Sequence, residues 1–569
     1  MTEDRVDAGM VVGGRTIAEP RLSAGGAVVA FVSVSRGRGA LMVVDAAGGP
    51  ERILAVDPEP ATRGGVFDWR PDGTALVYAG RRGGLWKVAS GGGPPVALIP
   101  DDVAVEGVAA GRQHIAFVVD QREIWTVSVD GGRPTLIDAS HDFAFDPAWT
   151  GDDLRWQAWD DPSMPWDESV IVRATPAGDP SVLFARAGFQ VQQPRGDAVL
   201  CDQNGWLNLW SLSRGHALLA EHFEHGGPSW GMGQRSFAWA PDGARIAFTR
   251  NENGFGRLCV LDLATMQVRE VARAVHDWLS WCGDRLAAVR TGGRTPTQLV
   301  VYDTATWARR TVAFGPVAGF ESVLVEPDLV TWPAGDGFVV HGRLYRPAAV
   351  TGAGPLLVWV HGGPTDQWPV RFMARVAWAL DRGWSVLVPD PRGSTGHGRA
   401  YAQALYGRWG ELDTSDVAAG IDAAIARGWT VPGWVVTIGA SAGGLTALGV
   451  VASRPDVVAG AIAAYPVTNP AALAEVTHRF EVHYTARLCA PEPIDLLTIK
   501  SPCLILQGSD DPVVPVEQTR AFVAALQARG APVDYHEYDG EGHGWRRPET
   551  TEDELTRMGD LLAGLGSPP

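Results

Sequence analysis

Apolar and polar positions recur through the first half of the chain in a unit of about forty residues, the period of a four-stranded propeller blade. The clearest copy begins at Phe67, turns at a Pro-Asp-Gly sequence at residues 71–73, and ends two strands later near Val88. The same order returns from Phe237, with Pro-Asp-Gly at residues 241–243. Proline sets φ in such a turn, aspartate caps it and glycine takes the positive φ. The pattern therefore predicts short antiparallel strands joined by tight turns.

Weaker copies of this unit bring the number of blade starts before residue 321 to seven. They begin near Pro20, Gly107, Phe145, Gln193 and Trp278. We therefore predict a β-propeller over residues 20–320, preceded by an N-terminal segment of residues 1–19. The count favours seven blades and leaves six and eight open.

The pattern changes in residues 321–569, where apolar runs alternate with helical segments. A hairpin arm is expected at residues 337–347. The predicted strands that follow it are Leu356–Val360, Trp384–Val388, Trp434–Ile438, Ala459–Tyr465, Pro502–Leu506 and Val533–Tyr538. Alternation of this kind predicts a parallel sheet covered by helices on both faces. The fold class is thus multidomain, an N-terminal β-propeller followed by a C-terminal α/β-hydrolase domain.

A serine lies where one of these strands meets the next helix. Ser441 is the centre of Gly-Ala-Ser-Ala-Gly at residues 439–443. Small neighbours let the backbone turn sharply, so that the hydroxyl projects and the amide of Ala442 is free to bind an oxyanion. A chain with 69 glycines can produce this pentapeptide by chance, so its meaning depends on the partners.

Two later strand ends supply such partners. Asp510 and Asp511 follow the strand that ends at Leu506, and His543 follows the last strand. A serine nucleophile needs an imidazole to take its proton and a carboxylate to orient that imidazole. Serine, then acid, then histidine is the chain order of the α/β-hydrolases.

The strand Leu356–Val360 runs into His361-Gly-Gly-Pro, where the glycines leave backbone N–H groups uncovered. One of these can join the amide of Ala442 around a tetrahedral intermediate. Each piece alone is more typical of a turn, a solvated acid or a surface histidine. Together, in order and at the strand ends of one domain, they indicate a hydrolase site.

With these motifs the chain resembles the prolyl oligopeptidase family of serine peptidases. The resemblance is closest to the acylaminoacyl-peptidase and dipeptidyl-aminopeptidase-like bacterial branch of that family. The matching stretches are residues 159–167, 221–230, 361–364, 391–398, 439–444, 506–515 and 540–545. The resemblance implies Ser441 as nucleophile, Asp511 as acid and His543 as base. It also implies a propeller that restricts access to the site by substrate size.

The chain departs from the family pattern in three places. His361 stands where several branches carry a tyrosine, which suggests an oxyanion hole built from backbone amides, those of Gly363 and Ala442. Gln507 stands where many relatives carry histidine. The segment Cys489–Lys500 is shorter than in relatives, and since it borders the active site, the substrate preference of relatives does not transfer directly.

Two runs break the blade rhythm, residues 160–167 and 221–230, and such interruptions often lie on a binding face. By analogy with dipeptidyl-peptidase relatives, Glu221 and Glu224 are candidates for binding a substrate amine. Trp230 and His361 complete the candidate substrate-binding set. The favoured alternative is that the glutamates are solvated or pair with a basic neighbour.

The histidines at 222 and 225 lack a third ligand nearby, so we expect no metal site.

Composition limits the class of partner. Acidic residues outnumber basic ones, 65 to 48, for a net charge of −17, which argues against nucleic acid and anionic membrane as partners. The five cysteines are scattered and odd in number, which suggests small buried residues without disulfides. With an acidic N-terminus and no apolar segment typical of a signal peptide, we expect a cytoplasmic protein.

The sequence therefore predicts a serine exopeptidase or oligopeptidase that cleaves short peptides through an acyl-enzyme and needs no cofactor. Self-association into a homo-oligomer is left open. One alternative is a carboxylesterase, because the same triad cleaves esters. Another is a non-catalytic propeller scaffold, against which the intact serine, acid and histidine speak.

Overall fold

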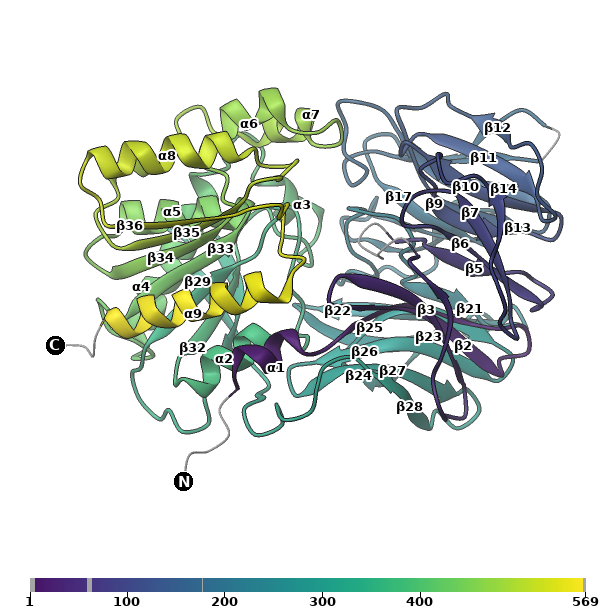
Figure 1. The fold of residues 1–569 in the computed structure, drawn as a ribbon, viewed down its shortest axis with the longest axis horizontal. Coiled ribbons are helices and arrows are strands. Elements are labelled where there is room, and N and C mark those ends of the chain that lie inside the picture. Colours follow the sequence, from purple (N-terminus) through teal and green to yellow (C-terminus); the bar gives the residue numbers. More distant parts are fainter. Residues whose placement is uncertain (1–5, 59–63, 176–177, 566–569) are drawn as a thin grey trace. The chain divides into compact units, whose positions relative to one another are not determined.

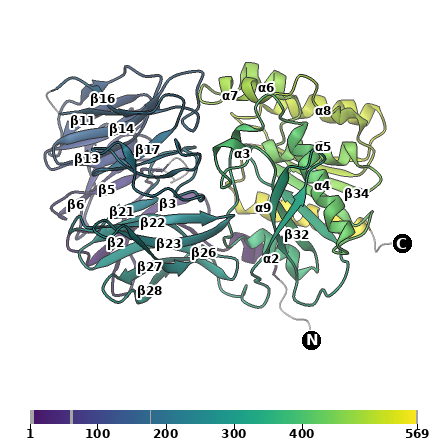
Figure 2. The same cartoon turned by 180° about the vertical axis from the view of Figure 1, so that it is seen from behind.

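The computed structural model describes residues 6–58, 64–175 and 178–565. The chain divides into two compact units, which Figures 1 and 2 draw from opposite sides. Arg15–Pro316 form the propeller unit. The described residues before Arg15 and after Pro316 form the hydrolase unit.

Within its described residues, the propeller unit consists of seven four-stranded sheets, each built from four strands that are consecutive in the chain. The seven-blade prediction is confirmed, and the predicted starts at Phe67 and Phe237 begin β5 and β21. In chain order the blades are β1 (Thr16–Leu22), β2 (Val28–Ser35), β3 (Arg38–Asp45), β4 (Arg52–Val56); β5 (Phe67–Trp69), β6 (Ala75–Ala79), β7 (Leu85–Ala89), β8 (Val96–Ile99); β9 (Glu106–Ala110), β10 (His114–Val119), β11 (Glu123–Ser128), β12 (Thr135–Asp138); β13 (Phe143–Thr150), β14 (Asp153–Trp159), β15 (Val170–Ala174), β16 (Ser181–Ala185); β17 (Val191–Arg195), β18 (Ala198–Cys201), β19 (Asn208–Ser211), β20 (His216–Ala217); β21 (Phe237–Trp239), β22 (Arg245–Glu252), β23 (Phe255–Asp262), β24 (Gln267–Arg273); β25 (Val275–Cys282), β26 (Arg285–Gly292), β27 (Thr295–Asp303) and β28 (Arg309–Phe314).

The ring closes by packing between the first and last blades. Val29 and Phe31 of β2 share one apolar cluster with Val289 of β26 and Leu299 of β27. The amide of Leu22 donates a hydrogen bond to Ser280 Oγ in β25 (3.0 Å). Since each blade uses only its own four strands, apolar burial holds the first blade against the last.

The hydrolase unit is built on one eight-stranded sheet, with the order β29-β30-β32-β31-β33-β34-β35-β36. The pairs β29/β30 and β30/β32 are antiparallel, and the remaining neighbours are parallel. Its strands are β29 (Asp328–Pro333), β30 (Val339–Tyr345), β31 (Leu356–Val360), β32 (Ser385–Asp390), β33 (Val435–Ala440), β34 (Val458–Ala464), β35 (Cys503–Gly508) and β36 (Val533–Tyr538). The parallel strands therefore present their carboxyl ends along one edge of the sheet.

Helices cover both faces of this sheet (Figure 1). One face packs on α2 and α9, whose buried side chains join Val436, Ile438 and Leu504 of the strands in one cluster. The opposite face carries α4, α5 and α8. The helices of the unit are α1 (Ala8–Val12), α2 (Ala374–Asp381), α3 (Arg399–Gln403), α4 (Leu412–Ala426), α5 (Ala442–Ser453), α6 (Pro470–Val476), α7 (Val482–Leu488), the 3₁₀ helix η1 (Leu496–Thr498), α8 (Val516–Ala528) and α9 (Pro548–Gly564). None of the described helices is long and apolar enough to cross a membrane.

Residues at the start of the chain pack on the hydrolase unit. Val6 is buried, its amide donates to Asp381 Oδ2 (2.8 Å), and its carbonyl accepts from Arg382 (3.0 Å). The short helix α1 then contacts α2 and α9. The chain thus contributes a short N-terminal piece to the hydrolase unit before it enters the propeller at β1.

Candidate functional site

Ser441 lies at a strained turn between β33 and α5. Its backbone has φ 56° and ψ −123°, a combination that non-glycine residues rarely adopt. Its amide donates to the carbonyl of Ala464 on the neighbouring strand (3.0 Å), and its carbonyl accepts from Val467 (3.2 Å). These backbone bonds hold the strained residue from the side of β34.

The glycines around Ser441 are required by close backbone contacts. A Cβ at Gly439 would lie 2.1 Å from the carbonyl oxygen of Gly443. A Cβ at Gly443 would lie 2.4 Å from the carbonyl oxygens of Val360 and His361. Any larger residue at either position would push α5 away from the sheet, so the pentapeptide has a steric reason in this fold.

His543 is bound by Asp511 at the same edge of the sheet. Asp511 Oδ2 lies 2.8 Å from His543 Nδ1. The Asp511 side chain is fully buried, whereas that of His543 is 21% exposed, so the imidazole faces an open side. Asp510 is exposed and its Oδ1 accepts from the hydroxyl of Ser509 instead (2.8 Å).

The carboxylate of Asp511 is held in place by its own loop. Its Oδ1 accepts from the amides of Val513 and Val514, both at 2.9 Å. Its Oδ2 also accepts from Gln507 Nε2 (3.2 Å), and Gln507 Oε1 accepts from Thr519 Oγ1 (2.8 Å). Gln507 therefore adds a donor to the carboxylate, which suits an ionised acid.

The loop after β31 runs directly beside Ser441. A Cβ at Gly362 would lie 3.7 Å from Ser441 Cβ and 3.3 Å from the carbonyl oxygen of Ala440. Gly363 has φ 120°, a conformation that favours glycine. Helix α5 begins at Ala442, and the first amides of a helix have no acceptor within it. The loop after β31 and the first turn of α5 therefore both adjoin Ser441.

His361 supports this loop from beneath. The residue is only 2% exposed. Its Nε2 lies 2.8 Å from Ser394 Oγ, and its Nδ1 lies 2.7 Å from the carbonyl oxygen of Gly362. Since both ring nitrogens already have protein partners, the ring orders the loop, and the side chain has no free polar atom for a substrate.

A buried polar network extends below the same loop. Arg343 and Asp390 form an ion pair in which both side chains are fully buried. Asp390 Oδ2 also accepts from Gln367 Nε2 and lies near His397 Nε2, both at 2.7 Å. Burial alone would raise the pKa of Asp390, but Arg343 and His397 outweigh it and hold this pKa well below its usual range.

The propeller residues predicted to bind substrate are engaged within their own unit. Glu221 contacts His225 Nε2 (2.9 Å) and Arg250 Nη1 (3.3 Å). Burial opposes ionisation of Glu221, but these contacts outweigh it and lower its pKa. Glu224 is buried and accepts from the amide of Leu207 (2.7 Å). The favoured alternative for these glutamates was that they are solvated or pair with a basic neighbour. Glu221 does pair with basic neighbours, His225 and Arg250.

Trp230, the remaining candidate in the propeller, is half-buried. Its ring packs against that of Trp166, with 4.5 Å between centroids. The two interruptions of the blade rhythm therefore meet through these tryptophans. Among the described residues, no group of three or more His, Cys, Asp or Glu side chains could hold a metal ion.

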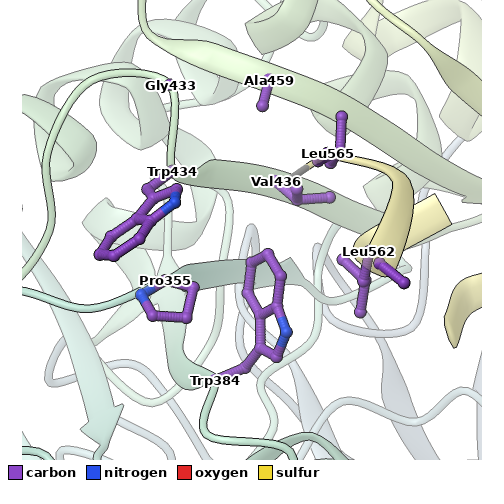
Figure 3. Close-up of a pocket in the computed structure, with 9 residues that line it drawn as sticks. Pro355, Trp384, Gly433, Trp434, Val436, Ala459, Leu562 and Leu565 are labelled. Carbon is purple, nitrogen blue, oxygen red and sulfur yellow. The ribbon is translucent and has the colours of Figure 1, made fainter. Parts of the chain in front are cut away.

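A pocket of about 440 Å³ lies at the other end of the hydrolase sheet. Figure 3 shows its walls, formed by the rings of Trp384 and Trp434 with Leu562 and Leu565 of the C-terminal region. Both tryptophans immediately precede strands, β32 and β33, whereas Ser441 follows β33. The pocket is thus at the amino ends of the strands and separate from the residues around Ser441.

Comparison with known families identifies one part of the hydrolase unit. Residues 370–564 match the model of the prolyl oligopeptidase family. The chain contains a prolyl oligopeptidase family domain. This confirms the resemblance on which the sequence analysis relied, and the match includes Ser441, Asp511 and His543.

Curated proteins that match part of this chain include two peptidases. The acylamino-acid-releasing enzyme of Arabidopsis thaliana is 30% identical over 215 residues, which cover 34% of this chain and 28% of the relative. Dipeptidyl aminopeptidase BIII of Pseudoxanthomonas mexicana is 29% identical over 215 residues, which cover 35% of this chain and 31% of the relative. The chain thus matches less than a third of the length of either relative.

Solved structures resemble the whole chain. A crystal structure of puromycin hydrolase has 28% identity and a TM-score of 0.86, covering 100% of this chain and 98% of that one. A puromycin-hydrolyzing peptidase of Mycobacterium tuberculosis has 24% identity and a TM-score of 0.90, with 100% and 97% covered. The second likeness concerns the fold alone, and both likenesses extend over the propeller unit as well as the hydrolase unit.

Several residues of the hydrolase unit that contact the glycine loop, its buried network or His543 were not indicated by the sequence. Asp390 directly ends β32, and a polar residue at the carboxyl end of a parallel strand was the available signal. Gln367 and Tyr465 belong to no motif that the sequence analysis used. Tyr465 contacts the ring of His543, with 4.6 Å between centroids.

Proposed function

We propose that the protein is a serine peptidase that hydrolyses short peptides through an acyl-enzyme. Ser441 Oγ attacks the carbonyl carbon of the substrate while His543 takes the hydroxyl proton. The amides of Gly363 and Ala442 stabilise the oxyanion. His543 returns the proton to the leaving amine, and a water molecule, activated by the same imidazole, hydrolyses the ester to restore Ser441.

The observation that supports this proposal is the contact between Asp511 and His543, at the edge of the sheet where the strained Ser441 also lies. A carboxylate at 2.8 Å from Nδ1 orients the imidazole and stabilises its charged form during proton transfer. The N-terminus of α5 adds a favourable dipole where negative charge develops. A strained backbone conformation costs free energy and is concentrated at functional sites, so the strain at Ser441 supports a functional role for this residue.

For the substrate we propose short peptides and aminoacyl amides. The curated relatives are named for the release of acylamino acids and of dipeptides, and one structural relative is named for puromycin, an aminoacyl amide. All three substrate classes contain an amide bond close to one end of a small molecule. They differ in whether the amine on the acyl side is free or acylated, and this difference guides the experiment.

The experiment measures kcat/KM of the purified protein on four matched substrates: an acylaminoacyl amide, a dipeptidyl amide with a free amine, puromycin, and a simple ester. Ser441→Ala serves as the matched control on each. Cleavage of at least one amide that requires Ser441 supports a peptidase. Cleavage of the ester alone would instead indicate a carboxylesterase. The enzyme proposal would be contradicted if the protein showed neither cleavage nor fluorophosphonate labelling that depends on Ser441.

We also propose an amine-binding site, a cellular location and a test of self-association. Glu221 and Glu224 are proposed to bind the free amine of a substrate. This amine would have to compete with His225, Arg250 and the amide of Leu207, which already bind the two carboxylates. A cytoplasmic location is in keeping with the five cysteines, none of which forms a disulfide in the described structure. Self-association is tested by the mass of the purified protein in solution.

A further inference from the structure

The backbone that follows β34 connects the surroundings of all three proposed catalytic residues. Ala464, the last residue of this strand, accepts the hydrogen bond from the amide of Ser441. The amide of the next residue, Tyr465, donates to the carbonyl of Leu506 (2.6 Å) on β35, the strand that leads to Asp511. Two consecutive residues are therefore fixed between the strand of the serine and the strand of the acid.

Tyr465 has an unusual backbone conformation for an aromatic residue. Its φ is 37°, on the left-handed side that side chains with a Cβ rarely adopt. In a strand, successive side chains alternate between the two faces of the sheet. A left-handed residue directly after the strand breaks this alternation and redirects its side chain. Such conformations persist where surrounding contacts over-determine them, and here the bond to Leu506 contributes.

The redirected ring meets the imidazole of His543. The centroids of Tyr465 and His543 lie 4.6 Å apart, with the ring planes at 57°. Trp545 contacts the same tyrosine from the side, at 5.1 Å and 81°, and is in turn packed against Tyr538 at 5.0 Å. His543 is therefore held by Asp511 at one nitrogen and by an aromatic ring that is itself supported.

We propose that Tyr465 is a positioning residue that keeps the imidazole of His543 in the orientation required for proton transfer with Ser441. This inference rests on the proposed function. The bond to Asp511 fixes Nδ1 but leaves the ring free to tilt about that contact, and a misdirected Nε2 costs rate steeply. An aromatic ring packed against the imidazole removes that freedom.

The contact that matters is the ring and not the hydroxyl. Burial, with the nearby carboxylate of Glu554, raises the pKa of Tyr465 to about 12, so the phenol stays neutral throughout the working range. The matched variants are therefore Tyr465→Phe, which retains the ring, and Tyr465→Leu, which removes it. Tyr535→Leu is the control, because Tyr535 is a partly exposed tyrosine of β36 whose hydroxyl donates to Glu537 (2.9 Å).

The experiment measures kcat, KM and the rate of fluorophosphonate labelling for each full-length variant. We expect Tyr465→Leu to lower kcat and the labelling rate together by roughly ten- to a hundred-fold, with KM changed less than about three-fold. Tyr465→Phe and Tyr535→Leu are expected within about two-fold of the wild type. Trp545→Leu, which removes the support of the tyrosine, is expected to act in the same direction by a smaller factor.

The outcomes separate this inference from the proposed function. If Ser441→Ala is inactive and unlabelled but Tyr465→Leu has wild-type kcat and labelling, the positioning role is wrong and the serine mechanism stands. A rise in KM with unchanged kcat would make Tyr465 a substrate contact and would also overturn the inference. If Tyr465→Leu does not fold, Trp545→Leu decides, and wild-type rates in that variant would contradict the proposal. Retention of labelling by Ser441→Ala would contradict the proposed function itself.

Discussion

Asp511 is buried and lies 2.8 Å from Nδ1 of His543, although Asp510, its neighbour in the chain, points to solvent. The difference arises from the loop that follows β35. The amides of Val513 and Val514 bind the carboxylate of Asp511 and turn it inward. Asp511, and not Asp510, therefore pairs with His543, because the amides of Val513 and Val514 orient its carboxylate.

The first prediction concerns the nucleophile. Ser441→Ala is expected to remove fluorophosphonate labelling and to lower kcat by roughly a million-fold, the scale found when a triad nucleophile is deleted. Mass spectrometry of the labelled protein checks the site, and the melting temperature should barely change because the substitution is small. Label on a different serine would show that the nucleophile lies elsewhere.

The second prediction compares the two aspartates. Asp511→Asn is expected to lower kcat by roughly ten-thousand-fold, because an amide favours the wrong tautomer of His543. Asp510→Asn is the matched control and is expected to retain nearly full activity. Steady-state kinetics on one amide substrate measures both, and a reversed ranking would remove the assigned role of Asp511.

The third prediction tests the buried ion pair beneath the glycine loop. Asp390→Asn leaves the charge of Arg343 buried and without its counter-ion, which should destabilise the protein by about 3–5 kcal/mol. Asp328→Asn removes the partner of Arg346 in an exposed pair at 3.2 Å and should cost less than about 1 kcal/mol. Differential scanning calorimetry compares the two variants. Equal melting temperatures would mean that burial does not distinguish these pairs.

The fourth prediction concerns the pH dependence of stability. Asp413 is buried on α4 and its Oδ2 accepts from Thr446 Oγ1 of α5 (2.5 Å). Burial raises the pKa of Asp413 to about 6, so between roughly pH 4 and 6 the folded state holds a proton that the unfolded chain has lost. This contribution to stability is present at low pH and is lost as the pH rises, by at most about 3 kcal/mol.

Asp413→Asn does not titrate, so the melting temperature of the wild type relative to this variant should fall between pH 4.5 and pH 7.5. The control is Asp422→Asn, an exposed position of the same helix whose carboxylate pairs with Arg454 at 2.8 Å, and removal of this surface pair should cost less than about 1 kcal/mol. A wild type that gains stability over Asp413→Asn as the pH rises would reverse the assigned sign.

Local patterns in the sequence were sufficient for the architecture. The Pro-Asp-Gly turns and the apolar alternation around Phe67 and Phe237 are encoded within a few residues, and both positions begin the first strand of a blade. The order of Ser441, Asp511 and His543 could likewise be read from the chain. Parallel strands present their carboxyl ends at one edge, so residues that follow such strands gather there without further information.

Contacts between distant side chains could not be read in this way. Glu221 and Glu224 were candidates for binding an amine, yet packing of the blades gives them Arg250, His225 and the amide of Leu207 as partners. The sequence also assigned no partner to Val6, which the structure buries against the end of α2. Such pairings depend on which surfaces the completed fold brings together.

Tyr465 shows the limit most clearly. As an aromatic residue at the end of an apolar strand, it was counted within the predicted strand Ala459–Tyr465, where alternation alone would assign its face. The structure ends β34 at Ala464 and gives the tyrosine a positive φ, a conformation that the bond from its amide to Leu506 helps to hold. The sequence by itself determined the strands and the turns, which follow from local periodicity and backbone hydrogen bonding, and the chain order of Ser441, Asp511 and His543. Only the tertiary structure decided which ring packs on His543, because that contact requires neighbouring strands to be in register first.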